Sequence, residues 1–106
     1  MHIAVTVQMK QKAISLLVIS GHAPVEPEEN FSLVCAQVSA ISVGILNSID
    51  TICPNTCDLT MEDGFVSIKV RKSSEQVQTI LKTLLIQLET VEYTNKKTIK
   101  IEKVEV

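Results

Sequence analysis

The stretch Ser73–Val91, with the sequence SSEQVQTILKTLLIQLETV, decides the fold. Ser73 and Gln76 have the spacing of a helix capping box, and apolar residues follow them at intervals of three and four. The members of this apolar stripe are Val77, Ile80, Leu81, Leu84, Leu85 and Leu88. The spacing predicts an amphipathic helix that runs to about residue 92 and buries one face.

Strand patterns lie on both sides of this helix. The tail Thr98–Val106 alternates between apolar and charged residues, which predicts a strand with one face in the core. Residues 58–71 contain two short strand-like runs around Asp63-Gly64, a dipeptide that favours the positive backbone angles of a tight hairpin turn. We therefore expect a hairpin before the helix and a single strand after it.

The first half of the chain repeats the arrangement of hairpin followed by helix. Residues 2–8 alternate and residues 13–20 are rich in Leu, Val and Ile, which predicts two strands. Pro24 and Pro27 then interrupt regular structure, so residues 21–30 form a loop. From about residue 32 to 49 the apolar residues again have helical spacing, with Ser32 as the expected N-cap and Asn30 as the other candidate.

The predicted element order is therefore ββαββαβ. Two amphipathic helices that cover one face of a mostly antiparallel sheet are the simplest architecture for this order, a two-layer sandwich of the α+β class. At 106 residues the chain is expected to form one domain over residues 1–106.

Charge and composition exclude several classes of function. A net charge of -2 gives no general attraction for nucleic acid, and the lysines at 96, 97, 100 and 103 are interrupted by glutamates along a strand-like segment. No long apolar run follows the N-terminus, so we expect a cytoplasmic protein without membrane contact. The three cysteines are expected to be free thiols.

In the segment Cys53-Pro54-Asn55-Thr56-Cys57, the two nearby cysteines suggest a possible pair of metal ligands. A tetrahedral site needs four ligands, and no second pair of Cys or His residues is spaced to complete it. We therefore expect neither a metal nor a cofactor, and a loop with free thiols there.

The candidates for chemistry are His22, at the end of the second predicted strand, and Cys35, in the first turn of the first predicted helix. The unpaired backbone N–H groups of a helix N-terminus favour a thiolate, which is the nucleophilic form of cysteine. An adjacent imidazole would complete a catalytic pair. By pattern alone, however, a cysteine on an amphipathic helix is more often a small buried apolar residue, and a histidine near a turn is usually incidental.

The sequences around these two residues favour the catalytic reading. The segments Ile19-Ser20-Gly21-His22-Ala23 and Val34-Cys35-Ala36-Gln37-Val38-Ser39 resemble the motifs of the ribosomal-processing cysteine protease family. The resemblance covers essentially the whole chain, since the element order also matches. It implies a homodimeric cysteine endopeptidase that removes the N-terminal extension of a large-subunit ribosomal protein precursor, designated L twenty-seven. His22 and Cys35 would then be its catalytic dyad.

The same resemblance implies supporting roles for Gly21, Ser32 and Ser39. Gly21 belongs to the Gly-His-Ala motif, and Ser39 lies on the same side of the helix as Cys35, one turn later. Ser39 fits either a substrate contact or a hydroxyl bonded back to a helix carbonyl. The family's substrates imply an apolar pocket. Candidates for its lining are Phe31, Leu33 and Val34, which could equally be core residues.

The chain departs from the family pattern at two places. The family usually has Asp three residues before the cysteine, where this chain has Ser32, so any role in orienting His22 would fall to Glu28, Glu29, Asn30 or to no residue. The loop 23–31 is one residue longer than the family pattern and contains Pro24 and Pro27, which should stiffen this expected lid.

Two functions follow from these observations. The first is a cysteine endopeptidase acting on a ribosomal protein precursor, without cofactor or direct nucleic-acid contact. The alternative is a non-catalytic protein-binding module of the same fold that acts in ribosome assembly, which the missing Asp favours and the retention of both His22 and Cys35 opposes.

Overall fold

The structure is a computed structural model that describes residues 2–25, 27 and 32–106. Its elements follow the predicted order ββαββαβ. They are β1 (Ile3–Lys10), β2 (Ala13–Gly21), α1 (Leu33–Ile52), β3 (Cys57–Glu62), β4 (Phe65–Val70), α2 (Glu75–Thr94) and β5 (Ile99–Glu105). Both helices are two to three residues longer at their C-terminal ends than the apolar stripes predicted.

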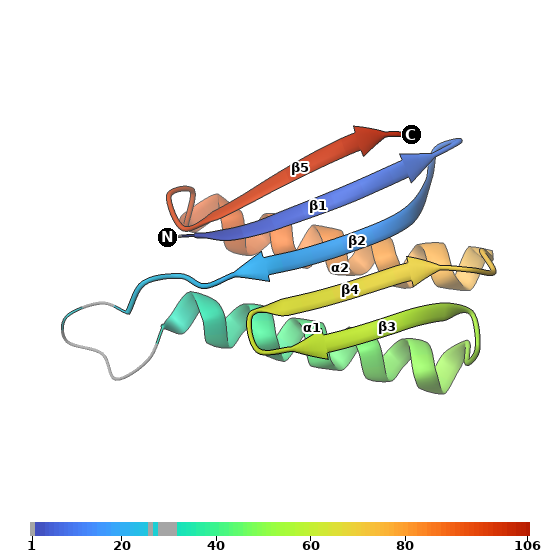
Figure 1. Cartoon of the computed structure of the whole chain (residues 1–106), viewed down its shortest axis with the longest axis horizontal. Helices are drawn as coiled ribbons and strands as arrows, with labels where there is room; N and C mark the ends of the chain where they lie inside the picture. The colour runs from blue at the N-terminus through green and yellow to red at the C-terminus, as the bar shows by residue number, and fades with distance from the viewer. Residues whose placement is uncertain (1, 26, 28–31) are drawn as a thin grey trace.

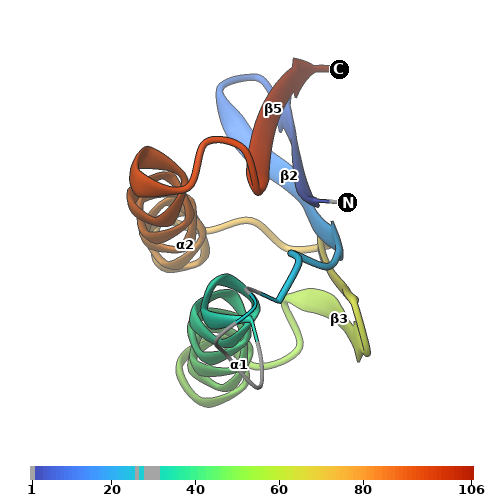
Figure 2. The same ribbon diagram turned by 90° about the vertical axis from the view of Figure 1, so that its left-hand side faces the viewer.

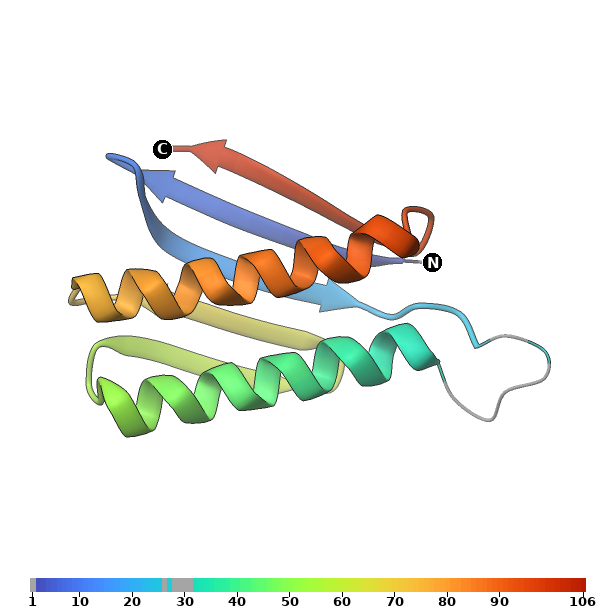
Figure 3. The same cartoon turned by 180° about the vertical axis from the view of Figure 1, so that it is seen from behind.

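The strands form one mixed sheet in the order β3-β4-β2-β1-β5 (Figure 1). The pairs β1–β2, β2–β4 and β3–β4 are antiparallel, whereas β1 and β5 run parallel. β5 can join β1 in parallel because α2 carries the chain back along the sheet before β5 begins (Figure 3). The predicted α+β class and mostly antiparallel sheet are confirmed.

Both helices pack on the same face of the sheet, which gives two layers (Figure 2). The core lies between the layers and is built almost entirely from aliphatic side chains. α2 contributes Val77, Leu81, Leu84, Leu85, Leu88 and Val91, and α1 contributes Val38, Ile45 and Ile49. Strands β1 and β2 meet these residues with alternate side chains such as Val5, Val7 and Leu17, because successive side chains of a strand point to opposite faces.

The helix starts test the capping predictions. Ser32 is the N-cap of α1, as expected, and Asn30 lies outside the described residues. The capping-box prediction for Ser73 is wrong by one residue, because Ser74 has the extended backbone of an N-cap and its hydroxyl accepts the Val77 N–H at 3.2 Å. Ser73 instead accepts a hydrogen bond from the Gln78 side chain.

Helix α1 is long and apolar enough to span a membrane by length and composition. The core helix of a globular protein passes the same test, and α1 contributes Val38, Ile45 and Ile49 to the core between the layers. Its outer face nevertheless exposes Val43 and Ile52. Length and composition alone therefore do not assign this helix to a membrane.

Candidate active site

The site begins where β2 ends, at Gly21. This residue has φ of +95°, and a Cβ there would collide with the backbone oxygen of His2, just before β1. Only glycine accommodates both the positive φ and the close approach. The Gly21 N–H donates to the Gly64 carbonyl at 2.9 Å, which ties the end of β2 to the turn between β3 and β4.

His22 follows directly and lies over that turn. Its side chain is exposed, and a Cβ built on Gly64 would be 2.5 Å from its Nε2 and 3.0 Å from its Cε1. The imidazole therefore packs against the backbone of Gly64, where any other residue would displace it. Gly64 has φ of +71°, as the Asp-Gly turn prediction requires.

Cys35 lies in the first turn of α1 and is half-buried. Its Sγ accepts the Ala23 N–H at 3.1 Å, and the thiol is 3.8 Å from the Ala23 carbonyl oxygen. Ala23 is the residue after His22, and its own side chain is buried. The hydrogen bond therefore fixes the chain beside His22 to the sulfur atom.

Ser32 holds the helix start in place. It is buried, and its hydroxyl accepts the Cys35 N–H at 3.2 Å while its carbonyl accepts the Ala36 N–H at 3.0 Å. Ser32 thus fixes the backbone of the cysteine as the N-cap of α1. Glu28, Glu29 and Asn30, the other candidates for orienting His22, lie outside the described residues.

A cavity of about 130 Å³ joins these groups. His22 and Cys35 both line it, together with two further residues predicted to support the site, Gly21 and Ser39. Its apolar walls come from the sheet and from α1, and consist of Ile3, Ile19, Val38 and Val66, with Met61 and Phe65 at the exposed rim. The cavity thus places a thiol and an imidazole beside a small apolar pocket.

The pocket differs from the one expected from sequence. Leu33 is 51% exposed and Val34 packs against the core, and neither lines the cavity. Side chains near Cys35 in sequence point elsewhere because successive helical residues are about 100° apart. Phe31, the third candidate, lies outside the described residues.

The β3–β4 hairpin is the part of the site that sequence reasoning missed. Glu62, Asp63 and Gly64 all line the cavity beside His22. The Asp-Gly dipeptide signalled the turn, but nothing in the sequence says that this turn folds over the end of β2. Among the described residues, the acidic Glu62 and Asp63 therefore border the site, whereas Ser32 stands where the family resemblance implies Asp.

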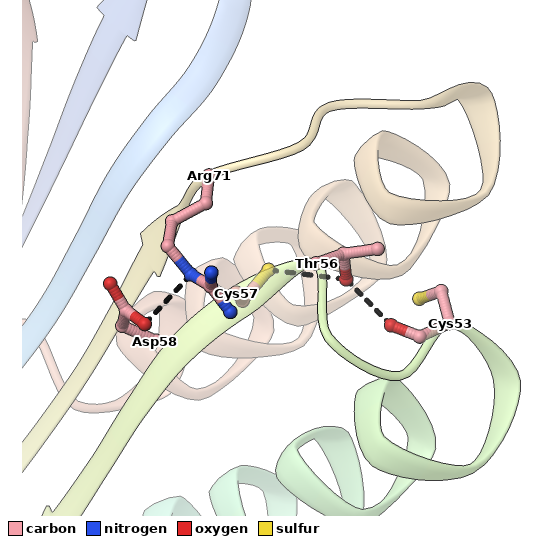
Figure 4. A network of polar contacts seen from close by, with 5 residues as sticks. All are labelled: Cys53, Thr56, Cys57, Asp58 and Arg71. Atoms are coloured by element: carbon pink, nitrogen blue, oxygen red, sulfur yellow. Dashed lines mark hydrogen bonds and ion pairs between the residues drawn. The ribbon is translucent and has the colours of Figure 1, made fainter.

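The Cys53–Cys57 loop lies apart from the site and forms its own polar network (Figure 4). The Thr56 hydroxyl donates to the Cys53 carbonyl at 2.6 Å and lies 3.8 Å from the Cys57 sulfur, and Arg71 pairs with Asp58 at 2.8 Å. All three cysteines are free, and burial raises the pKa of the Cys57 thiol. Among residues 2–25, 27 and 32–106, no group of three His, Cys, Asp or Glu side chains is placed to hold a metal.

Comparison with known proteins identifies the family of this fold and site. The family model described as cysteine protease Prp matches residues 2–100. The chain belongs to the cysteine protease Prp family. Within that family, it is 29% identical over 79 residues to the ribosomal processing cysteine protease Prp of Staphylococcus aureus strain Mu50, which covers 72% of this chain and 74% of that protein.

Solved structures agree with this assignment. A crystal structure of the S. aureus ribosomal processing protease Prp with a covalently linked product peptide has a TM-score of 0.85 and 27% identity, and the match covers 95% of this chain and 98% of that one. The same S. aureus protease with a substrate peptide has a TM-score of 0.82 at 25% identity, with the same coverage. A Streptococcus mutans protein shares the fold, with a TM-score of 0.84 at 23% identity over 99% of this chain and 96% of that one.

Proposed function

We propose that this member of the Prp family is a cysteine endopeptidase in which Cys35 is the nucleophile and His22 is the general base and then the general acid. The observation that carries the proposal is the shared cavity, where Cys35 at a helix N-terminus and His22 at a strand end border one small pocket. The Ala23 N–H on Sγ supports the same roles, because it holds the residue next to His22 against the sulfur atom.

In the first step, His22 accepts the proton of the Cys35 thiol, and the sulfur attacks the scissile carbonyl carbon. A C–S bond forms, and the carbonyl oxygen becomes an oxyanion. Collapse of this intermediate breaks the C–N bond. The imidazolium gives its proton to the leaving amine, and an acyl-enzyme remains on Cys35.

In the second step, water attacks the thioester carbon while His22 takes one of its protons. A C–O bond forms, the C–S bond breaks, and the carboxylic product leaves as the imidazolium returns its proton to the sulfur. No metal or cofactor enters either step.

The geometry restricts which groups stabilise the oxyanion. Of the backbone N–H groups at the start of α1, those of Cys35 and Ala36 are already donated to Ser32. Ser39, an exposed residue that lines the cavity one turn after Cys35, carries a hydroxyl that is a candidate oxyanion donor on α1.

We propose a large-subunit ribosomal protein precursor, L twenty-seven, as the substrate, cleaved after its N-terminal extension during ribosome maturation. Support comes from the relatives' names as ribosomal processing proteases and from the apolar pocket, which suits the apolar side chains that the family resemblance implies. The S. aureus protease has itself been crystallised with a substrate peptide.

The test is incubation with a peptide of the precursor N-terminus, followed by mass spectrometry. We expect one cleavage by the parent protein and none by Cys35→Ala or His22→Ala. Cys57→Ala is the matched control, since Cys57 lies outside the cavity, and it should cleave at the parent rate. Peptide binding without cleavage by the parent would instead favour the non-catalytic module, for which Ser32 in place of Asp is the supporting observation.

The remaining expectations are also proposals. We propose a homodimer in the cytoplasm, without membrane or direct nucleic-acid contact, on the basis of the family resemblance and the net charge of -2. Light scattering coupled to size-exclusion chromatography measures the molar mass of the protein in solution. The mass of a single chain, 11.7 kDa, at micromolar concentration would contradict the dimer. Fractionation of cells that produce the tagged protein tests its location.

A further inference from the structure

The imidazole of His22 presents its outer tip to the turn between β3 and β4. A Cβ built on Gly64 would lie 2.5 Å from Nε2, 3.0 Å from Cε1 and 3.2 Å from Cδ2, and Nδ1 is not among these nearest atoms. Nε2 is therefore the ring nitrogen that faces the turn. Nδ1, beside the point where the ring joins the side chain, is left for a second partner.

The two nitrogens of a neutral imidazole have different roles, since one carries a hydrogen and donates while the other accepts. A partner that accepts from one nitrogen fixes the hydrogen there and leaves the other nitrogen as the base. The proton of the Cys35 thiol must pass to the nitrogen that carries no hydrogen. The acceptors of the β3–β4 turn therefore decide which nitrogen serves Cys35.

A carboxylate that could act as such an acceptor lies on this turn. Ser32, which stands where the family resemblance implies Asp, has no charge, and its hydroxyl accepts the Cys35 N–H at 3.2 Å as the N-cap of α1. Among the described residues that line the cavity, the carboxylates are those of Glu62 and Asp63. Both belong to the segment that leads into Gly64, so the negative charge lies on the side of the ring that Nε2 faces.

Strand geometry favours Asp63 over Glu62. Glu62 forms the last residue pair of the hairpin with Phe65, and Val66, the next residue, is buried in the core under the helices. Because successive side chains of a strand alternate between the two faces, Glu62 and Phe65 point away from the helices. Asp63 lies beyond this last pair and directly precedes Gly64, so no strand register directs its carboxylate away from the imidazole.

We infer that Asp63 is a positioning residue for His22, whose carboxylate accepts the Nε2–H during catalysis and leaves Nδ1 to exchange a proton with the Cys35 sulfur. The inference rests on the proposed function and adds a third partner to its dyad. The thiol proton moves from Sγ to Nδ1 and from there to the leaving amine, while the hydrogen on Nε2 stays in place. Between these two transfers the carboxylate offsets the positive charge of the ring.

The kinetic test uses Asp63→Asn, because asparagine before glycine suits the same turn and only the charge is removed. On the precursor peptide, kcat should fall about tenfold while KM stays within about twofold, since the charged ring exists only during the reaction. Asp58→Asn is the matched control. It removes the same charge from the same hairpin, outside the cavity, and should cleave at the parent rate. A parent rate for Asp63→Asn, or the loss in Glu62→Gln instead, would overturn the inference.

A spectroscopic measurement on the free protein separates positioning from a general loss of structure. The chain has two histidines, so isotope-labelled histidine gives two sets of ring nitrogen signals, and His22→Ala identifies the set of His22. In mildly alkaline solution we expect the hydrogen on Nε2 in the parent and in Asp58→Asn, and a mixture of the two neutral forms in Asp63→Asn. A hydrogen on Nδ1 in the parent, or identical signals in the parent and Asp63→Asn, contradicts the role of Asp63.

The two measurements distinguish this inference from the proposed function. If the parent and Asp63→Asn cleave the peptide equally well, the protease function stands and the role of Asp63 fails. If the parent cleaves nothing, the catalytic proposal fails, and the ring signals by themselves decide whether Asp63 positions His22.

Discussion

The imidazole of His22 packs against Gly64, a residue 42 positions later in the sequence, so closely that a Cβ on Gly64 would lie 2.5 Å from Nε2. The Gly21 N–H bond to the Gly64 carbonyl holds the two segments together. The β3–β4 turn therefore forms the surface on which the proposed general base rests.

Gly64→Ala should consequently reduce peptide cleavage at least tenfold. The new methyl group displaces the imidazole, and the positive φ of 71° costs about 1–2 kcal/mol of stability for a residue with a Cβ. Cleavage assays and urea unfolding measure the two effects. Asn55→Ala is the matched control, because Asn55 also has a positive φ, of 64°, but lies outside the cavity. Equal losses of activity in both variants would show that strain alone is responsible.

The two helix N-caps provide a second test. Ser32 and Ser74 each accept an N–H at 3.2 Å, from Cys35 and Val77 respectively. Replacing either by Ala should lower the free energy of unfolding by about 1 kcal/mol. Only Ser32→Ala should also slow alkylation of Cys35, because only that cap fixes the cysteine backbone. If Ser74→Ala slows the alkylation equally, the effect comes from global destabilisation.

The three thiols should differ in their reaction with iodoacetamide. Cys35 should react first, and this rapid reaction should be lost in His22→Ala. Cys53 is protected because its side chain is buried. Peptide mapping by mass spectrometry gives the order of labelling, and labelling of Cys53 or Cys57 before Cys35 would contradict the assignment of the nucleophile.

The labelling of Cys57 and its contribution to stability should both depend on pH. Burial is the main cause of its raised pKa, partly offset by the Thr56 hydroxyl, so the thiol stays protonated at pH values where an ordinary cysteine, with a pKa of 9.0, ionises. Its labelling should become appreciable only in more alkaline solution than labelling of the unfolded chain. Because the folded-state pKa is the higher one, the contribution of Cys57 to stability is full below pH 9 and is lost as the pH rises further. Cys57→Ala should therefore flatten the alkaline loss of stability in urea titrations, and an unchanged slope would contradict this.

Gln78 joins α2 to the start of β2. Its side-chain oxygen accepts the Ile14 N–H at 2.8 Å, and its side-chain nitrogen donates to the Ile14 carbonyl at 2.9 Å. Gln78→Ala leaves both backbone groups unpaired in a partly buried position, and should lower the free energy of unfolding by about 2 kcal/mol. Gln76→Ala, an exposed change in the same turn, should cost little. Similar urea midpoints for the two variants would contradict a structural role for Gln78.

The sequence determined the elements of this protein, because helix and strand periodicity, turn dipeptides and caps are local properties. The apolar stripe Val77–Leu88 and the turn at Asp63-Gly64 were predicted correctly for this reason. The one-residue error at Ser73 arose because adjacent serines are equally good caps by type, and only the backbone conformation at Ser74 distinguishes them.

The sequence also singled out His22 and Cys35, since the motifs around them are local and carry the family resemblance. Tertiary structure decided what surrounds them. The apolar walls of the pocket come from β1, β2, β4 and Val38 of α1 rather than from Leu33 and Val34, and the β3–β4 turn packs against His22. Both depend on strand order and on the rotation of α1, which are set by packing between segments far apart in the chain. The same packing buries the Ser42 hydroxyl without a hydrogen-bond partner among the described residues, a feature that no local pattern could reveal.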